Sequence, residues 1–193
     1  MSVSEEQEHG LRQRLVAVGV ELVAAEGTAA LSLREIARRA GVSHGAPRRW
    51  FPTHRELLSA IAREGFTALA AQVAAATGAG PREQLAALAR GYLEFALANP
   101  GMYELMFRHD LLESGTSGLR DTSLPLFHRL AGLVAQARPG AAEPQVAAAA
   151  LWANLHGVAQ LWSWRSLQLA SGSEDFDGVL ARLLEAHLGP AGR

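Results

Sequence analysis

The stretch SLREIARRAGVSHGAPRRWF, residues 32–51, contains the signals for the start and the end of one short helix and for the start of another. Ser32 and Glu35 have the spacing of a capping box, in which the hydroxyl accepts the N–H of Glu35 and the carboxylate reaches back to the N–H of the cap. This pair predicts a helix that begins at Leu33. Gly41 predicts its end, because glycine adopts the left-handed conformation after a helix without a clash at Cβ.

The residues of this first helix separate into an apolar and a basic side. The apolar positions recur at helical spacing, and we expect them to be buried: Leu33, Ile36, Ala37 and Ala40. The basic positions are expected to face solvent: Arg34, Arg38 and Arg39.

Two further helices are predicted after the glycine. The second covers residues 44–51, with Ser43 as its cap. Thr53 and Glu56 repeat the capping-box spacing and predict a third helix directly afterwards. Two short helices joined by a glycine turn, the second of them basic, meet the requirements of a helix-turn-helix that places one helix in the major groove of DNA.

Positive charge is concentrated on this stretch. Between Ser32 and Arg55 there are six arginines and one glutamate, so six minus one gives a local charge of +5, whereas the whole chain carries −1. An arginine-rich helix is often no more than a solvated surface. The capping pattern around this one favours DNA binding instead.

The pattern S-L-R-E-I-A-x-x-A-G-V-S, followed by H-G-A-P-R-R-W-F-P-T-H-R-E-L-L, resembles the N-terminal DNA-binding domain of TetR/AcrR-type transcriptional regulators. The match extends over residues 11–66. The segments NPGMYELMF, residues 99–107, and LWANLHGVAQLW, residues 151–162, resemble the ligand domain of one large subgroup.

This resemblance implies two domains and a set of DNA contacts. The domains are a helix-turn-helix domain at residues 8–68, with its motif at 32–51, and a helical ligand-binding and dimerisation domain at 69–193. The boundary falls within a long helix that links them. The residues implied to contact double-stranded DNA are Ser32, Arg34, Ser43, His44, Gly45, Ala46, Arg48, Arg49 and His54.

Three positions depart from the pattern of the family. Arg48 replaces a tyrosine that contacts phosphate, and arginine can still bind phosphate or instead bind guanine through two hydrogen bonds. Trp50 replaces a histidine or tyrosine and is expected to pack at the base of the helix. His54 replaces a lysine that contacts phosphate, so this contact is expected to be weak unless the imidazole is protonated.

Composition predicts an all-α protein and excludes some kinds of chemistry. The 193 residues are 49% hydrophobic and only 6% aromatic, with few β-branched runs. The absence of cysteine excludes disulfides, thiolate metal sites and cysteine nucleophiles. No apolar segment approaches the ~18 residues that span a membrane, so we expect a soluble, cytoplasmic protein that binds no membrane. No catalytic residue, metal ligand or cofactor is assigned.

The remaining elements follow from periodicity and from breaks at glycine and proline. Residues 1–10 are polar and are expected to form an arm, residues 114–117 a loop, and Pro125 is expected to start or kink its helix. Beyond the motif, helices are predicted at residues 11–26, 57–77, 81–98, 101–108, 119–137, 146–169 and 176–188.

The helix predicted at 146–169 is apolar on more than one side and must be buried all round. A homodimer would bury the second side. The resemblance implies that the helices at 146–169 and 176–188 form the dimer interface. A purely intramolecular core is the alternative.

A pocket for a small apolar effector is the last site that we predict. Large side chains on the C-terminal helices could surround a cavity, although for any one of them ordinary core packing is the more common explanation. These side chains are Phe95, Met102, Tyr103, Met106, Phe107, Phe127, Trp152, His156 and Trp162.

These features predict a dimeric, ligand-responsive repressor that binds a pseudo-palindromic operator. Two alternatives stay open. A binding module of the same fold could act through a protein partner, or sense a small molecule without specific DNA recognition. The other alternative is an enzyme. An acid–base or metal cluster could be formed by His109, Asp110, Glu113 and His128, but no known catalytic motif is present.

Overall fold

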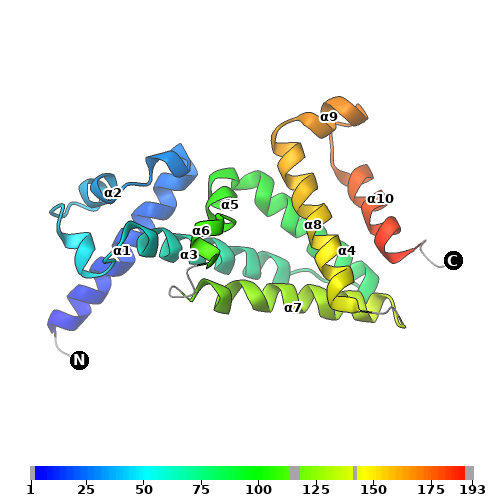
Figure 1. Cartoon of the computed structure of the whole chain (residues 1–193), viewed down its shortest axis with the longest axis horizontal. Helices are drawn as coiled ribbons and strands as arrows, with labels where there is room; N and C mark the ends of the chain where they lie inside the picture. Colours follow the sequence, from blue (N-terminus) through cyan, green and yellow to red (C-terminus); the bar gives the residue numbers. More distant parts are fainter. Residues whose placement is uncertain (1–2, 114–117, 141–142, 190–193) are drawn as a thin grey trace. The chain divides into compact units, whose positions relative to one another are not determined.

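The computed structural model describes residues 3–113, 118–140 and 143–189, and every regular element in these ranges is helical (Figure 1). The all-α prediction is therefore confirmed. Contacts divide the chain into two compact units: Met1–Thr67 with Asn99–Thr122, and Ala68–Ala98 with Ser123–Arg193. The predicted loop at 114–117 lies outside the described residues. In the part of the chain described, no helix has both the length and the apolar character needed to cross a membrane.

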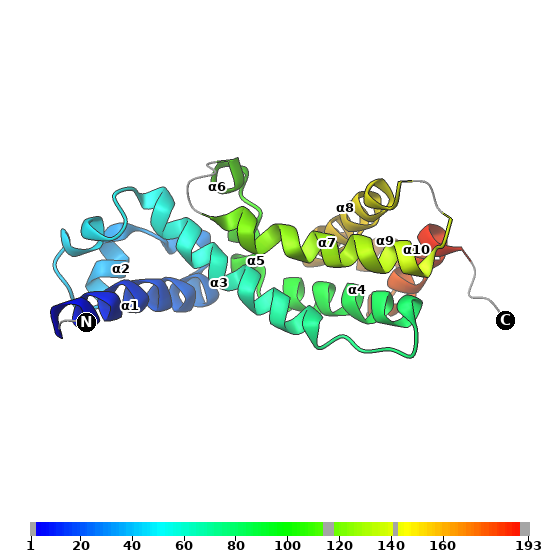
Figure 2. The same ribbon diagram turned by 90° about the horizontal axis from the view of Figure 1, so that it is seen from below.

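The first unit contains the N-terminal helices and two short helices from the middle of the chain. Its elements are α1 (Val3–Glu26), η1 (Thr28–Ala30), α2 (Leu33–Arg39), η2 (Ala46–Arg49), the start of α3 (His54–Ala74), α5 (Pro100–Met106) and α6 (His109–Glu113). α2 packs against α1, and Figure 2 shows both near the start of α3. The expectation of an arm at residues 1–10 is wrong for residues 3–10, which form the first turns of α1.

α5 is a part of the first unit. It packs against α1 and η1, and the Thr28 hydroxyl donates a 2.8 Å hydrogen bond to the Glu104 carboxylate. Met102 and Met106 are buried and lie against Gly65 of α3. The compact units thus group residues 99–122 with the N-terminal helices, while the assignment of functions to residues 8–68 and 69–193 stays a prediction.

The second unit is built around α4, α8 and α10. Its elements are the end of α3, α4 (Pro81–Ala98), most of α7 (Leu119–Ala137), α8 (Pro144–Ser163), α9 (Ser166–Ser171) and α10 (Asp177–Leu188). α4 packs against α8, and α10 packs against both (Figure 1).

Two arginines of α4 bind the two ends of α10. Arg90 forms a 2.8 Å ion pair with Asp177 at the start of α10, and Arg82 donates a 2.6 Å hydrogen bond to the carbonyl of Gly189 just after its end. Because the earlier residue of α4 meets the later end of α10, the two helices run antiparallel.

The prediction of one helix over residues 146–169 is wrong. α8 ends at Ser163, the chain bends through Trp164 and Arg165, and α9 begins at Ser166. Arg165 has a φ of 61°, in the left-handed region, and this single residue breaks the helix. Neither glycine nor proline marks the break, and the apolar periodicity continues through it. The sequence pattern therefore does not indicate that the helix ends here.

Candidate nucleic-acid interface

The turn after α2 has the geometry that its glycine predicts. Gly41 has a φ of 67°, its N–H donates to the Arg38 carbonyl at 3.2 Å, and the N–H of Val42 donates to the Ala37 carbonyl at 3.0 Å. These two bonds form a Schellman motif, which satisfies carbonyls that the helix end leaves unpaired. The chain therefore leaves α2 at a defined angle.

The predicted capping box at the start of α2 is half confirmed. The backbone N–H of Glu35 donates to the Ser32 hydroxyl at 3.1 Å, and α2 begins at Leu33. The Glu35 carboxylate does not reach back to the cap. It accepts hydrogen bonds from Arg38, at 2.6 and 2.8 Å, and from Arg39 at 2.7 Å. Two guanidinium groups at i+3 and i+4 compete more strongly for the carboxylate than one backbone N–H.

This ion-pair cluster changes the charge of the motif. Hydrogen bonds from Arg38 and then Arg39 lower the pKa of Glu35 to about 2. The same bonds raise the pKa of both arginines, and Arg39 also pairs with Glu26 of α1. Two of the six arginines counted in the motif are thus already paired with carboxylates.

The other four of these arginines are exposed, and three of them lie within residues 32–51: Arg34 on α2, and Arg48 and Arg49 on η2. None of the three forms an ion pair with any residue in the described ranges. Exposed, unpaired guanidinium groups are the side chains best suited to bind phosphate or guanine. The cationic surface of the motif is therefore smaller than its composition indicates.

The predicted second helix at 44–51 is much shorter than expected. Only Ala46–Arg49 is helical, as one 3₁₀ turn, and no side chain caps it. Its first turn contains Pro47, which has no N–H to donate and is buried. Ser43 contributes its backbone carbonyl, which accepts the N–H of Ala46 at 3.0 Å, so the predicted side-chain cap is wrong.

The residues around this turn anchor it to the first unit. Phe51 is 2% exposed, and the Arg12 guanidinium lies 5.2 Å from the centre of its ring. Trp50 is half-buried. The other positions predicted to meet DNA here differ in exposure. Ser43, His44 and Gly45 are exposed, whereas Ala46 is half-buried.

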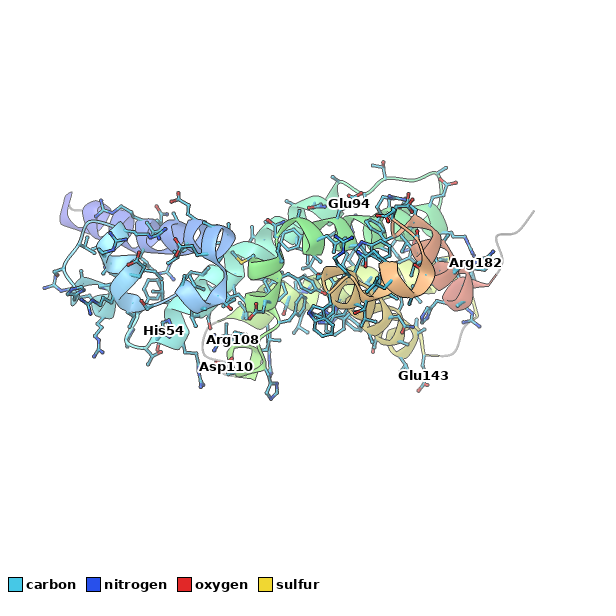
Figure 3. All side chains as sticks on the ribbon, turned by 90° about the horizontal axis from the view of Figure 1, so that it is seen from above. His54, Glu94, Arg108, Asp110, Glu143 and Arg182 are labelled. Atoms are coloured by element: carbon cyan, nitrogen blue, oxygen red, sulfur yellow. The ribbon has the colours of Figure 1, made fainter. Side chains whose placement is uncertain are left out.

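The second capping box, at the start of α3, is also half confirmed, because the Glu56 carboxylate accepts from the Thr53 hydroxyl at 3.2 Å and not from the Thr53 N–H. The N–H of Glu56 donates to the Thr53 hydroxyl at 3.2 Å, and α3 begins at His54 (Figure 3). The His54 imidazole, expected to face a phosphate, bonds instead within the protein. Its Nε2 lies 2.7 Å from the carbonyl oxygen of Leu31.

The residues predicted to line a pocket fall in both compact units. The first unit contains Met102, Tyr103, Met106 and Phe107, and the second contains Phe95, Phe127, Trp152, His156 and Trp162. In the first unit the Tyr103 and Phe107 rings meet edge to face at 4.9 Å. In the second, Trp162 meets Phe176 at 6.1 Å.

Tyr92 of α4 connects the predicted residues of the second unit, and our sequence analysis missed it. Trp152 Nε1 donates to the Tyr92 hydroxyl at 3.2 Å, and that hydroxyl lies 3.1 Å from Nδ1 of His156. The Trp152 ring also meets Phe127 at 6.4 Å and His156 at 6.2 Å. Burial lowers the pKa of His156, so the neutral imidazole is favoured. Tyr92 lies 64 residues from His156 along the chain, and no local pattern connects them.

The residues considered for an enzymatic cluster have other contacts. Asp110 accepts hydrogen bonds from Arg108 at 2.8 and 3.0 Å, and the two side chains lie side by side in Figure 3. The Arg108 hydrogen bonds lower the pKa of Asp110, and the charge of Arg55 lowers it further. His128 is exposed on α7, and the Glu113 side chain lies outside the described residues.

Two family models match the chain. Residues 15–61 match the bacterial regulatory proteins of the tetR family, and residues 85–187, more than half of the chain, match the tetracyclin repressor-like C-terminal domain. The chain belongs to the TetR family. Members of this family bind DNA operators, dimerise, and are generally not enzymes. The helix-turn-helix predicted at residues 32–51 of this TetR-family protein lies inside the first match.

Solved structures share the fold over nearly the whole chain. A protein of unknown function from Rhodococcus sp. RHA1 is 29% identical, with a TM-score of 0.79 over 92% of this chain and 93% of its own. A putative regulatory protein is 24% identical, with a TM-score of 0.73 over 96% and 98%. BioQ, solved with its natural double-stranded DNA operator, is 20% identical, with a TM-score of 0.66 over 93% and 98%. No curated protein matches the chain.

Proposed function

We propose that this TetR-family protein is a cytoplasmic, dimeric, ligand-responsive repressor of transcription that binds a pseudo-palindromic operator. Support for DNA contact comes from the three exposed arginines without an ion pair in the described ranges, Arg34, Arg48 and Arg49. BioQ, which has the same fold, binds an operator duplex. In a dimer, two such motifs would lie about 34 Å apart, in successive major grooves.

DNA binding is tested by fluorescence anisotropy on DNA from upstream of the protein's own gene, against scrambled DNA, over a salt series. Selective binding that weakens steeply with salt supports the proposal. Equal, weak binding to both duplexes would instead favour the binding module that acts through a protein partner.

A matched pair of variants makes this test specific to the site. Arg49→Ala should weaken binding and lower the magnitude of the salt slope by about 0.9, the value for one phosphate contact. Arg38→Ala removes an arginine of the same motif that is already paired with Glu35, so it should change the slope much less. Equal effects of both variants would show that only the total charge of the motif matters.

The dimer proposal is supported by the outer face of α8. Exposed or half-exposed apolar residues recur along it at spacings of three or four: Val146, Ala150, Ala153, Gly157, Leu161 and Trp164. Val146 is 60% exposed and Leu161 is 40% exposed. No atom lies within 4 Å of the position that a Cβ on Gly157 would take, so a second helix could approach there. We infer that this face, together with the outer face of α10, meets a second copy of the chain.

The effector half of the proposal concerns the second unit. Phe127, Trp152 and His156 combine aromatic surface with the polar ring nitrogens of Trp152 and His156, which suits a small, mostly apolar molecule. EbrR, a multidrug binding protein of the same fold, has been solved with imidazole. Binding would release DNA only if the effector prefers one of two conformations of the dimer.

A screen of small aromatic compounds for release of labelled operator tests this half. Trp152→Phe should weaken the response to an active compound and leave DNA affinity unchanged. A response that Trp152→Phe leaves intact would place the effector elsewhere.

A further inference from the structure

His54 is held by a hydrogen bond within the first unit. It is the first residue of α3, and its Nε2 lies 2.7 Å from the carbonyl oxygen of Leu31, 23 residues earlier (Figure 3). A carbonyl oxygen can only accept a hydrogen bond. Nε2 must therefore carry the hydrogen, and the ring is the Nε2–H tautomer when it is neutral.

This tautomer leaves the neutral ring with no hydrogen to offer DNA. Nε2–H is used by Leu31, and Nδ1 is an acceptor with a lone pair. A phosphate oxygen is also an acceptor, so the neutral imidazole of His54 cannot donate a hydrogen bond to it.

The acceptor of this hydrogen bond is at the start of α2. Leu31 is 4% exposed, ends η1 and directly precedes Ser32, the cap of α2. Arg34 lies in the first turn of the same helix. The contact of His54 thus joins the first residue of α3 to the segment from which α2 begins.

The other end of α2 is held by a different contact. Arg39, the last residue of α2, pairs with Glu26 of α1. A helix of only seven residues has little rigidity of its own and depends on such contacts for its orientation. The bond from His54 holds the opposite end of α2, where Ser32 and Arg34 lie.

We propose that His54 is a positioning residue of the helix-turn-helix, which orients the start of α2 through the Leu31 carbonyl, and that it is not a phosphate ligand. This inference rests on the proposed DNA-binding function. It assigns to His54 a role different from that of the lysine usual at this position in the family.

The first test needs no DNA. A long-range ¹H–¹⁵N spectrum of the wild-type protein at pH 8.5, where histidine is ordinarily neutral, should show His54 as the Nε2–H tautomer. The signal is assigned by its absence from the spectrum of His54→Gln. An Nδ1–H tautomer would overturn the proposal, whether or not the protein binds DNA.

The second test measures operator binding over a salt series at pH 8.5 and again at pH 5.5, where a histidine that contacts phosphate would be charged and would contribute to the salt slope. His54→Ala should weaken binding about fivefold, which corresponds to one hydrogen bond of about 1 kcal/mol, with the salt slope unchanged. His54→Gln is uncharged but can still donate to Leu31, and it should stay within twofold of the wild type.

The outcomes separate the two roles. A salt slope that falls by about 0.9 in both variants would identify a phosphate contact and overturn the proposal. Wild-type affinity in His54→Ala would overturn it as well. Absence of selective DNA binding by the wild type would refute the proposed function instead, and the tautomer would then decide the structural assignment. If His54→Ala does not fold, the tautomer measured in the wild-type protein decides between the two roles of His54.

Discussion

Replacing Gly101 with alanine should destabilise the first unit, because a Cβ there has no room. It would lie 2.6 Å from the carbonyl oxygen of Val23 and 3.2 Å from the Cα of Gly27, and both of these are backbone atoms. Ordinary contact begins at 3.4 Å, so the distance between α5 and α1 would have to increase by 3.4 minus 2.6, or about 0.8 Å.

The cost can be bracketed from its two parts. Overpacking of this kind costs about 1–3 kcal/mol. Alanine has the higher helix propensity and offsets up to about 1 kcal/mol. With the full offset the net destabilisation is up to about 2 kcal/mol, or up to about 8 °C in Tm for a protein of this size.

Gly132→Ala is the matched control. It is the same substitution inside a helix, α7, but no atom lies within 4 Å of the new Cβ. It should stabilise the protein by about 0.5–1 kcal/mol. Urea and thermal unfolding followed by circular dichroism compare both variants with the wild type. If Gly101→Ala were as stable as Gly132→Ala, the close approach of α5 to α1 would be refuted.

Three further predictions concern other parts of the protein. An NMR titration should place the midpoint of the Glu35 carboxyl near pH 2. Because folding lowers this pKa from 4.5, the arginine pairs stabilise the fold fully above pH 4.5, and this stabilisation is lost as the pH falls towards 2. A midpoint near 4.5 would exclude the arginine pairs. Tyr92→Phe removes the hydroxyl that accepts a hydrogen bond from Trp152 and contacts His156. In urea denaturation this variant should have a free energy of unfolding about 1 kcal/mol lower than the wild type, and an unchanged value would contradict these hydrogen bonds. Gly157→Leu should shift the sedimentation coefficient from that of a dimer to that of a monomer. It should not lower the stability of the monomer, since no atom of the chain lies within 4 Å of the new Cβ. A variant that stays fully dimeric would show that the interface lies elsewhere.

Several features of the helix-turn-helix follow from its sequence because they depend on residues close together in the chain. Ser32 and Thr53 cap helices through N–H groups three residues later. The turn at Gly41 ends α2 through bonds from the N–H groups of Gly41 and Val42 to carbonyls three and five residues earlier. Pro81 begins α4 for a similarly local reason, since its φ is already helical and its missing N–H has no partner in a first turn. Even the pairs of Glu35 with Arg38 and Arg39 could have been anticipated from their i+3 and i+4 spacing.

Elsewhere local patterns led to wrong expectations. The apolar periodicity of residues 146–169 predicts one helix, but Arg165 adopts a left-handed conformation that no glycine announces. Ser43 as a cap predicts a helix over residues 44–51, but only Ala46–Arg49 is helical, as one 3₁₀ turn that no side chain caps. In both segments the local pattern is compatible with a helix but does not fix where the helix begins or ends.

The all-α class, the helix-turn-helix and several helix boundaries could be predicted from the sequence, because caps, glycine turns and proline starts use hydrogen bonds within a few residues. Which charged and polar groups remain available for function depends on contacts between helices. Glu26 pairs with Arg39 from another helix, Leu31 accepts a bond from His54 across 23 residues, and Tyr92 meets His156 across 64. Such partners are brought together by the packing of whole helices, which no short stretch of sequence encodes.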